Sequence, residues 1–359
     1  MKILILANMD IGLYQFRKEL IYELLKKNEV YISLPYGKLV EPLKEAGCKF
    51  INTPVDRRGI NPFTDLKLLK KYFSIFAKVN PDLVITYTIK PNIYGGLACS
   101  MKKIPYAENI TGLGTAFENG GLLTKLVTVM YKIALRKSKV VFFENSENKN
   151  TFLDRKIIKH GQAKLLNGAG VNLEHYTYHD YPENENVRFL FVGRVMKEKG
   201  IDELFVAMKK LISNGVKCSL DVVGPFEEDY KEKLKKYETE GWLKYHGYQD
   251  DVRPFINACD CFVLPSYHEG MANTNLECAA SGRPVITSNI PGCKEAVIDG
   301  VSGFLCETKN AKSLYETMNK MTEISIIERK AMGIAGRKHM ENVFDKKKVV
   351  DETIKIIMR

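Results

Sequence analysis

Hydrophobic and polar positions follow two alternating periods along the first half of the chain. Short apolar runs are typical of strands buried on both faces of a parallel sheet, and apolar residues three and four positions apart are typical of amphipathic helices. Strands are predicted at 2–7, 30–34, 83–87 and 140–143, and helices at 14–27, 39–46, 65–79 and 122–137. Regular alternation of this kind predicts a doubly wound parallel sheet.

The pattern breaks at 168–182, where Gly, Asn, His, Tyr and Pro gather without periodicity, and then starts again. Strands are predicted at 187–192, 219–223, 261–264 and 284–287, and helices at 202–212, 229–237, 273–281, 311–321, 326–342 and 345–358. We therefore predict two Rossmann-like α/β domains, 1–170 and 171–342, and a C-terminal helix over 343–359 that could cross back to the first domain. Such domains leave a cleft between them, and ligands bind beyond the carboxyl ends of the strands.

Length and composition are those of an ordinary globular protein. The 359 residues suffice for two cores, and 45% are hydrophobic and 27% charged. The longest segment without Asp, Glu, Lys or Arg is 91–101, about half of what a membrane-spanning helix needs. The eight cysteines are scattered, and Cys259 and Cys261 are interpreted as core residues of a strand. With no cleavable signal pattern at the start, a reduced, cytosolic protein is expected.

Charge is distributed unevenly between the two halves. Residues 1–170 carry 27 Lys and Arg against 14 Asp and Glu, whereas the remainder carries 27 against 29. A basic half suggests an anionic partner such as nucleic acid, phospholipid or a phosphorylated acceptor. The candidate contacts are Arg17, Arg57, Arg58, Lys102, Lys103 and Lys125.

The segment 265–277 carries the strongest chemical signal. It follows a predicted strand and opens a helix, so backbone N–H groups near its start form an anion site. Glu269 lies in the loop and Glu277 about one turn into the helix. Two carboxylates beside a backbone phosphate site suit a ligand with hydroxyl groups on both sides of its phosphates. Alternatively, both serve only the helix dipole.

A second segment lies at the first strand-to-helix turn of the second domain. Gly193 permits a tight turn, and Arg194 and Lys199 follow it. Each cation would stabilise a diphosphate at short range. Alone this pattern is common in surface turns; combined with the carboxylate loop it indicates a site for a nucleotide diphosphate.

The two segments together read Gly193-Arg194-x4-Lys199-Gly200 and Glu269-x7-Glu277, which resembles the retaining glycosyltransferases of family GT4 with the GT-B fold. The resemblance runs along the whole chain. It is closest to the bacterial branch that extends sugars linked to undecaprenyl diphosphate, similar to its N-acetylgalactosaminyltransferases. The segments 8–17, 86–92, 109–114 and 168–172 support this closer match.

The resemblance implies a role for each matching residue. Arg194 and Lys199 would bind the donor diphosphate, Glu277 the ribose, and Glu269 the transferred sugar. Further donor contacts would come from Gly12, Gly193, Gly270, Met271, Ala272, Asn273, Thr274 and Asn275. Acceptor contacts would come from Tyr14, Lys90, Asn92 and Thr111, with Lys90 standing where many relatives have a histidine. At 273–275 the sequence departs from the commonest motif, so the side-chain contacts there are open.

The implied reaction moves a HexNAc or hexose from a nucleotide sugar, UDP- or GDP-linked, to a lipid-diphosphate-linked saccharide of surface polysaccharide, such as capsule. The family retains anomeric configuration. The chain has no Asp-x-Asp, and no metal or other cofactor is expected. The enzyme is expected to be peripheral on the inner face of the cell membrane. A non-hydrolysing sugar-nucleotide epimerase is the alternative, while a nucleic-acid binder lacks the basic and aromatic pattern it would need.

Overall fold

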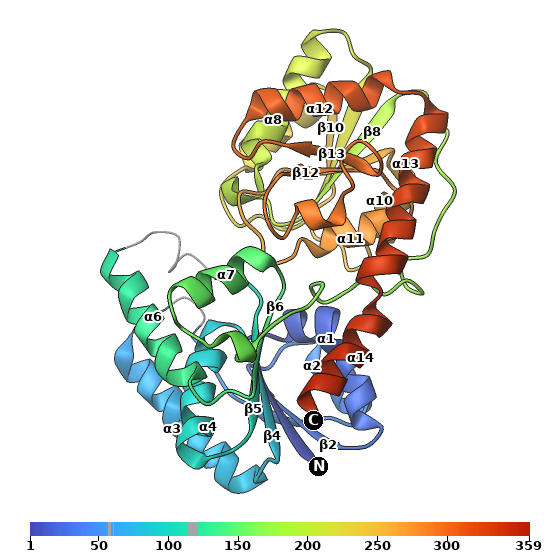
Figure 1. The fold of residues 1–359 in the computed structure, drawn as a ribbon. Helices are drawn as coiled ribbons and strands as arrows, with labels where there is room; N and C mark the ends of the chain where they lie inside the picture. The colour runs from blue at the N-terminus through green and yellow to red at the C-terminus, as the bar shows by residue number, and fades with distance from the viewer. Residues whose placement is uncertain (57–58, 60, 114–120) are drawn as a thin grey trace. The chain divides into compact units, whose positions relative to one another are not determined.

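Figure 1 shows the computed structural model of the chain, which describes residues 1–56, 59, 61–113 and 121–359. Arg57 and Arg58 lie outside the described residues. The chain divides into two compact units. Unit 1 contains residues 1–169 and 346–359, and unit 2 contains residues 170–345.

Unit 1 is built on a seven-stranded parallel sheet in the order β3-β2-β1-β4-β5-β6-β7. Its strands are β1 (Lys2–Leu6), β2 (Glu29–Leu34), β3 (Lys49–Asn52), β4 (Leu83–Tyr87), β5 (Tyr106–Ile110), β6 (Val140–Phe143) and β7 (Ala163–Leu165). Its helices are α1 (Asp10–Leu25), α2 (Val40–Glu45), α3 (Pro62–Val79), α4 (Gly96–Lys102), α6 (Gly121–Leu135), α7 (Ser146–Asp154) and α14 (Lys346–Ile357). The π-helical turn η1 (Pro91–Gly95) precedes α4, and the 3-10 turn η2 (His160–Gln162) precedes β7.

Both faces of this sheet are covered, because successive side chains of a strand point to opposite sides. On β1, Ile3 and Ile5 join a core with residues of α1, α2 and α14. Leu4 and Leu6 join the opposite core, which α3 and α4 cover, and α6 packs on that same side over β5 and β6. The C-terminal helix α14 packs beside α1 (Figure 1) and belongs to unit 1.

Unit 2 is built on a six-stranded parallel sheet in the order β10-β9-β8-β11-β12-β13. Its strands are β8 (Val187–Val192), β9 (Cys218–Val223), β10 (Leu243–Tyr245), β11 (Cys261–Leu264), β12 (Val285–Ser288) and β13 (Gly303–Cys306). Its helices are α8 (Ile201–Ser213), α9 (Lys231–Thr239), α10 (Arg253–Ala258), α11 (Asn273–Ala280), α12 (Ala311–Glu323) and α13 (Ile326–His339). Shorter turns are η3 (Lys197–Lys199), η4 (Lys294–Ala296) and η5 (Met340–Phe344).

The predicted fold class is confirmed, since both sheets are parallel and doubly wound. Each sheet has one point where the strand order reverses, between β1 and β4 in unit 1 and between β8 and β11 in unit 2. Loops that leave the carboxyl ends of two such strands diverge and open a crevice, which is the usual ligand site of these sheets. The fold therefore directs attention to the segments after β1 and β4, and after β8 and β11.

Two sequence interpretations can be compared directly with the structure. All eight cysteines are buried and unbridged. Of the pair Cys259 and Cys261, only Cys261 lies in a strand, because Cys259 caps the end of α10. Among the described residues, no helix is both long and apolar enough to cross a bilayer.

Candidate active site

The turn after β8 is held by a close approach of two backbones. The N–H of Gly193 donates to the carbonyl of Val223 at 2.9 Å. Gly224 has a φ of +140°, and a Cβ on it would lie 1.9 Å from the carbonyl oxygen of Gly193. Only glycine fits there without moving backbone. Gly224 was not predicted, because one glycine after a strand carries no distinctive pattern.

Arg194 follows this turn with its side chain 47% exposed. Its guanidinium lies 3.6 Å from a carboxylate oxygen of Glu227, which is a loose ion pair. The cation thus stands at the carboxyl edge of β8 and keeps donors for an anionic ligand.

Gly200 brings the loop after β8 against the loop after β11. Its φ is +70°, and a Cβ on it would lie 2.1 Å from the carbonyl oxygen of Pro265. The N–H of Tyr267 donates to the carbonyl of Glu198 at 2.9 Å, which ties the same two loops together. The loop after β8 and the loop after β11, which the sequence predicted as two separate parts of a site, therefore meet at the strand-order reversal of unit 2.

Lys199 and Glu269 touch at this meeting point. The Lys199 ammonium forms an ion pair with the Glu269 carboxylate, and the two side chains are only 18% and 13% exposed. The hydroxyl of Ser266 donates to Oε1 of Glu269 at 2.8 Å and fixes the carboxylate. Because an ammonium has three donors, Lys199 can hold Glu269 and still reach a phosphate oxygen. Sequence reasoning predicted both residues but not their contact.

The loop that leads into α11 is positioned by Gly292. The N–H of Ala272 donates to the Gly292 carbonyl at 2.7 Å, so this predicted backbone contact is already used within the protein. A Cβ on Gly292 would lie 2.6 Å from the carbonyl oxygen of Glu269. The first-turn N–H groups of Asn273 and Thr274 have no helical acceptor, as at any helix start, and they supply the anion-binding character of this end.

The side chain of Asn275, in the first turn of α11, is turned into the protein. Asn275 is fully buried, and its Nδ2 donates to the hydroxyl of Thr287 at 3.0 Å. That hydroxyl donates in turn to the carbonyl of Leu264 at 2.7 Å, which links α11 to β11 and β12. The side chain of Asn275 is thus a brace of the site. Its backbone N–H donates to the carbonyl of Ala272 at 3.0 Å, so both the backbone N–H and Nδ2 of Asn275 are engaged within the protein.

Glu277 lies near the start of α11 beside Tyr176, which comes from the segment that precedes β8. Burial, and then the charge and hydrogen bonding of Glu277, raise the pKa of Tyr176. Tyr176 therefore stays a neutral phenol that can donate to this carboxylate. Arg337 of α13 donates to the carbonyls of Tyr176 and Ala280 at 2.8 and 2.9 Å and holds the two segments together. Tyr176 was not predicted, since no motif marks it.

The predicted acceptor residues and Gly12 all belong to unit 1. Gly12 lies in the first turn of α1, and Tyr14 follows it with the Lys18 ammonium 4.8 Å from its ring centroid. Lys90, in the segment after β4, forms an ion pair of 2.6 Å with Asp65 of α3, which also accepts from Tyr94 at 2.8 Å. These residues lie at the strand-order reversal of this sheet, as their positions after β1 and β4 require.

The side chain of Asn92 is hydrogen-bonded inside the protein. It is 1% exposed, its Oδ1 accepts from Thr86 at 2.6 Å, and its Nδ2 donates to the carbonyl of Asn109 at 2.9 Å. It joins the ends of β4 and β5 from the inside, so its side-chain polar atoms are engaged within the protein, and its acceptor contact stays a prediction. Thr111 follows β5 directly and is partly buried.

Arg17 is also engaged within the protein. Its guanidinium pairs with the Glu144 carboxylate, both side chains are 10% exposed, and it lies 5.1 Å from the ring centroid of Tyr87. Burial raises the pKa of Glu144, and Arg17 opposes that rise. Arg17 is therefore unavailable as a surface cation, and the prediction that it contacts an anionic partner is wrong.

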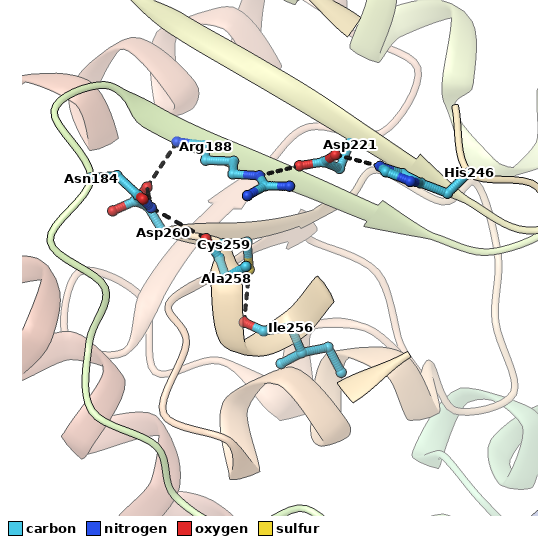
Figure 2. A network of polar contacts seen from close by, with 8 residues as sticks. All are labelled: Asn184, Arg188, Asp221, His246, Ile256, Ala258, Cys259 and Asp260. Carbon is cyan, nitrogen blue, oxygen red and sulfur yellow. Dashed lines mark hydrogen bonds and ion pairs between the residues drawn. The ribbon is translucent and has the colours of Figure 1, made fainter. Parts of the chain in front are cut away.

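A polar network inside unit 2 includes the side chain of His246 (Figure 2). Nε2 of His246 lies 2.5 Å from Oδ1 of Asp221, whose other oxygen accepts from Arg188. The backbone N–H of Arg188 donates to Asp260 at 2.9 Å, which continues the network to the start of β11. His246 thus has a structural partner. In the part of the chain that the structure describes, no three His, Cys, Asp or Glu side chains form a group that could hold a metal ion.

Comparison with known proteins matches each unit to a family model of glycosyltransferases. Residues 179–339 match the family model of glycosyl transferases group 1, and residues 2–145 match the model described as glycosyl transferase 4-like. The chain is 28% identical over 342 residues to the N,N'-diacetylbacillosaminyl-diphospho-undecaprenol alpha-1,3-N-acetylgalactosaminyltransferase of Campylobacter jejuni, with 90% of each chain covered.

It is similarly 28% identical over 347 residues to the capsular polysaccharide biosynthesis glycosyltransferase CapM of Staphylococcus aureus, with 92% of this chain and 90% of CapM covered. Among solved structures, that of Anabaena HepE in complex with UDP and glucose superposes with a TM-score of 0.81 at 16% identity, over 100% of this chain and 99% of HepE. The chain belongs to the group 1 glycosyltransferases, family GT4, and has the GT-B fold.

Proposed function

We propose that the enzyme transfers a sugar from a UDP-sugar to a saccharide carried on a lipid diphosphate, in the assembly of a surface polysaccharide. The observation that carries the proposal is the meeting of Lys199 and Glu269 at the strand-order reversal of unit 2, with Arg194 on the adjacent turn. A cation and a carboxylate held in contact can bind the two parts of a nucleotide sugar that separate in the reaction, the diphosphate and the sugar.

The proposed mechanism depends on stabilising the leaving group. The donor is already activated, so the enzyme's main task is to stabilise negative charge on the departing diphosphate. Arg194, Lys199 and the first turn of α11 do this with fixed cations and backbone N–H groups. Glu269 would accept from hydroxyls of the transferred sugar, and Glu277 from the ribose. Departure and attack on the same face of the sugar give retention, with the leaving phosphate oxygen as the base.

The choice of donor and acceptor is supported by the relatives and by charge. The relative from Campylobacter is named for an undecaprenyl-diphosphate acceptor, and the HepE structure holds UDP. Unit 1, which carries the candidate acceptor residues, has 32 Lys and Arg against 16 Asp and Glu. A basic unit suits an acceptor that carries a diphosphate and lies at an anionic membrane surface.

A donor screen tests the proposal. The full-length enzyme is incubated with UDP- and GDP-linked HexNAc and hexose donors and a lipid-diphosphate-GlcNAc acceptor, with and without excess EDTA. We expect transfer from one UDP-sugar, with the anomeric configuration retained and EDTA without effect. Transfer only from GDP-sugars, loss of activity in EDTA that Mn²⁺ restores, or an epimerised donor in the absence of acceptor would each contradict a stated part of the proposal.

A further inference from the structure

The outward face of α6 carries an apolar row that nothing in the described structure covers. Leu122, Leu126, Val129 and Ile133 are 86%, 57%, 52% and 54% exposed. They are spaced four, three and four residues apart, so they align along one side of the helix. The opposite side, which includes Val127, Tyr131 and Leu135, is buried in the core of unit 1. Helix α6 thus has two apolar faces, and the described part of unit 1 buries one of them.

Cations flank this row and acids are absent from it. Lys125, Lys132 and Arg136 are exposed and lie on one side of the row at helical spacing. Residues 121–143 contain five Lys and Arg and no Asp or Glu. A second copy of this chain packed on the same face would oppose like charges, which disfavours self-association. An anionic lipid surface instead offers acyl chains to the apolar row and phosphate groups to the cations.

The row begins at the edge of the sheet where the candidate acceptor residues lie. Because α6 connects β5 to the parallel strand β6, its first residues lie at the carboxyl edge of the sheet. Phe63, in the first turn of α3, is 77% exposed at the same edge and two residues from Asp65, the ion-pair partner of Lys90. Both helices cover the same face of the sheet. Leu122 and Phe63 are therefore exposed apolar groups on the side of the acceptor site.

We propose that α6 is a membrane-docking helix, which inserts its row Leu122, Leu126, Val129 and Ile133 into the interfacial region of an anionic leaflet while Lys125, Lys132 and Arg136 contact lipid phosphates. The helix has 15 residues and is about 22 Å long, so it lies in the surface plane. The inference rests on the proposed function, because a lipid-linked acceptor is what makes docking useful. It goes beyond attraction by net charge alone, which salt would abolish.

Vesicle binding of a charged variant tests the proposal. Leu126→Glu places a carboxylate in the row, and Val206→Glu on α8 is a matched control, since Leu126 and Val206 are 57% and 56% exposed. We expect wild type and Val206→Glu to bind phosphatidylglycerol vesicles and to stay partly bound at about 500 mM salt. Leu126→Glu should lower the affinity for these vesicles by about tenfold or more and leave the melting temperature unchanged. Equal binding of both variants, or no binding by wild type, would overturn the proposal.

Insertion depth gives a second readout. All eight cysteines are buried, so a cysteine introduced by Leu126→Cys can be labelled selectively with an environment-sensitive fluorophore. Its emission should shift to the blue on phosphatidylglycerol vesicles, and that of labelled Val206→Cys should not. An unshifted Leu126 label would overturn the insertion. So would light scattering that shows a dimer which Leu126→Glu dissociates, because a second copy would then occupy the row.

Two acceptors separate this inference from the proposed function. Leu126→Glu should lose transfer to a long-chain acceptor in vesicles and keep wild-type transfer to a short, water-soluble analogue. Equal loss on both acceptors would place Leu126 in the reaction site and contradict a docking role. If wild type transfers to neither acceptor with any donor, the proposed function fails, and the vesicle and fluorescence results still decide whether α6 docks.

Discussion

Lys199 and Glu269 of unit 2 each have two tasks, which are to bind part of the ligand and to hold the other side chain in place. The cation belongs to the proposed diphosphate site and the carboxylate to the proposed sugar site, yet each holds the other in place. Removing either one therefore changes a ligand contact and the position of its partner. Variants must be chosen so that these effects can be told apart.

The cations should control the rate of the chemical step. Arg194→Ala and Lys199→Ala are each expected to lower turnover by roughly 10²–10³, the usual effect of removing one preorganised stabiliser of developing charge. Neither should unfold the protein, because Arg194 is exposed and Lys199 lies in a short 3-10 turn outside the cores of the fold. Lys197→Ala, an exposed cation in the same turn as Lys199, is the control and should keep its activity. Turnover near that of wild type in both variants would remove these residues from the mechanism.

The two glutamates should differ in their effect on nucleotide affinity. Glu277→Gln is expected to weaken UDP binding, because its proposed partner is the ribose. Glu269→Gln should leave UDP affinity unchanged or raise it, since Lys199 loses a competing carboxylate, while turnover falls. Calorimetric titration of both variants with UDP, next to turnover, measures these quantities. Equal losses of UDP affinity would show that one of the two assignments is misplaced.

Glu108 should make unit 1 sensitive to pH. Its carboxyl is fully buried in β5, and burial raises its pKa well above the ordinary value of 4.5. The folded protein then binds a proton that the unfolded chain releases, so the free energy of unfolding falls as pH rises above about 4.5. Glu108→Gln should flatten this fall in chemical denaturation between about pH 5 and 8. Exposed Glu45→Gln is the control, and identical slopes in all three proteins would contradict the prediction.

At the scale of elements, the sequence predicted strands by their apolar character and missed several whose apolar runs are short or interrupted by polar residues. Strand β1 was placed to within a residue of its observed end, because every residue after Lys2 is apolar. Strand β5 was missed, since Glu108 and Asn109 interrupt its apolar run although both are buried. Short strands such as β3 and β10 carry lysines and were missed for the same reason.

The same limit applies to the site. Both loops could be located from local motifs, because each motif is contiguous in the sequence. Their contact could not, since Lys199 and Glu269 are 70 residues apart and meet only through the strand order of the sheet. The burial of Asn92 and Arg17 could not be predicted either, because the sequence around a polar residue does not show whether its partners lie inside the protein.

The junction of the two loops should be sensitive to one methyl group. Gly200→Ala forces a Cβ to within 2.1 Å of the backbone of Pro265 at a φ of +70°, so one loop must move. We expect a loss of about 2–5 kcal/mol in the free energy of unfolding and a fall in turnover as Lys199 shifts. Gly215→Ala is the matched control, with a φ of +77° and no atom within 4 Å. It should cost about 1–2 kcal/mol and leave turnover intact, and equal effects would contradict the steric explanation.

At the scale of the whole molecule, the structural division sharpens the asymmetry of charge seen in the sequence. Unit 1 has 32 Lys and Arg against 16 Asp and Glu, whereas unit 2 has 22 against 27. The C-terminal helix α14 contributes to this difference, because it returns to unit 1 with its lysines. The family assignment gives the asymmetry a meaning, since a glycosyltransferase of this fold has two substrates to hold.

Salt should therefore affect the two substrates differently. The Debye length falls from about 10 Å at 0.1 M to about 3 Å at 1 M, which screens long-range attraction but spares short, partly buried contacts. The proposed acceptor is drawn by the net positive charge of unit 1, so its KM should rise several-fold over this range. The proposed donor is held by close contacts such as that of Lys199 in a unit of slight negative charge, so its KM should change little. The measurement uses a short, water-soluble lipid-diphosphate acceptor, so that salt acts on acceptor binding and not on binding to vesicles. Parallel rises in both KM values would show that charge does not divide the substrates between the units.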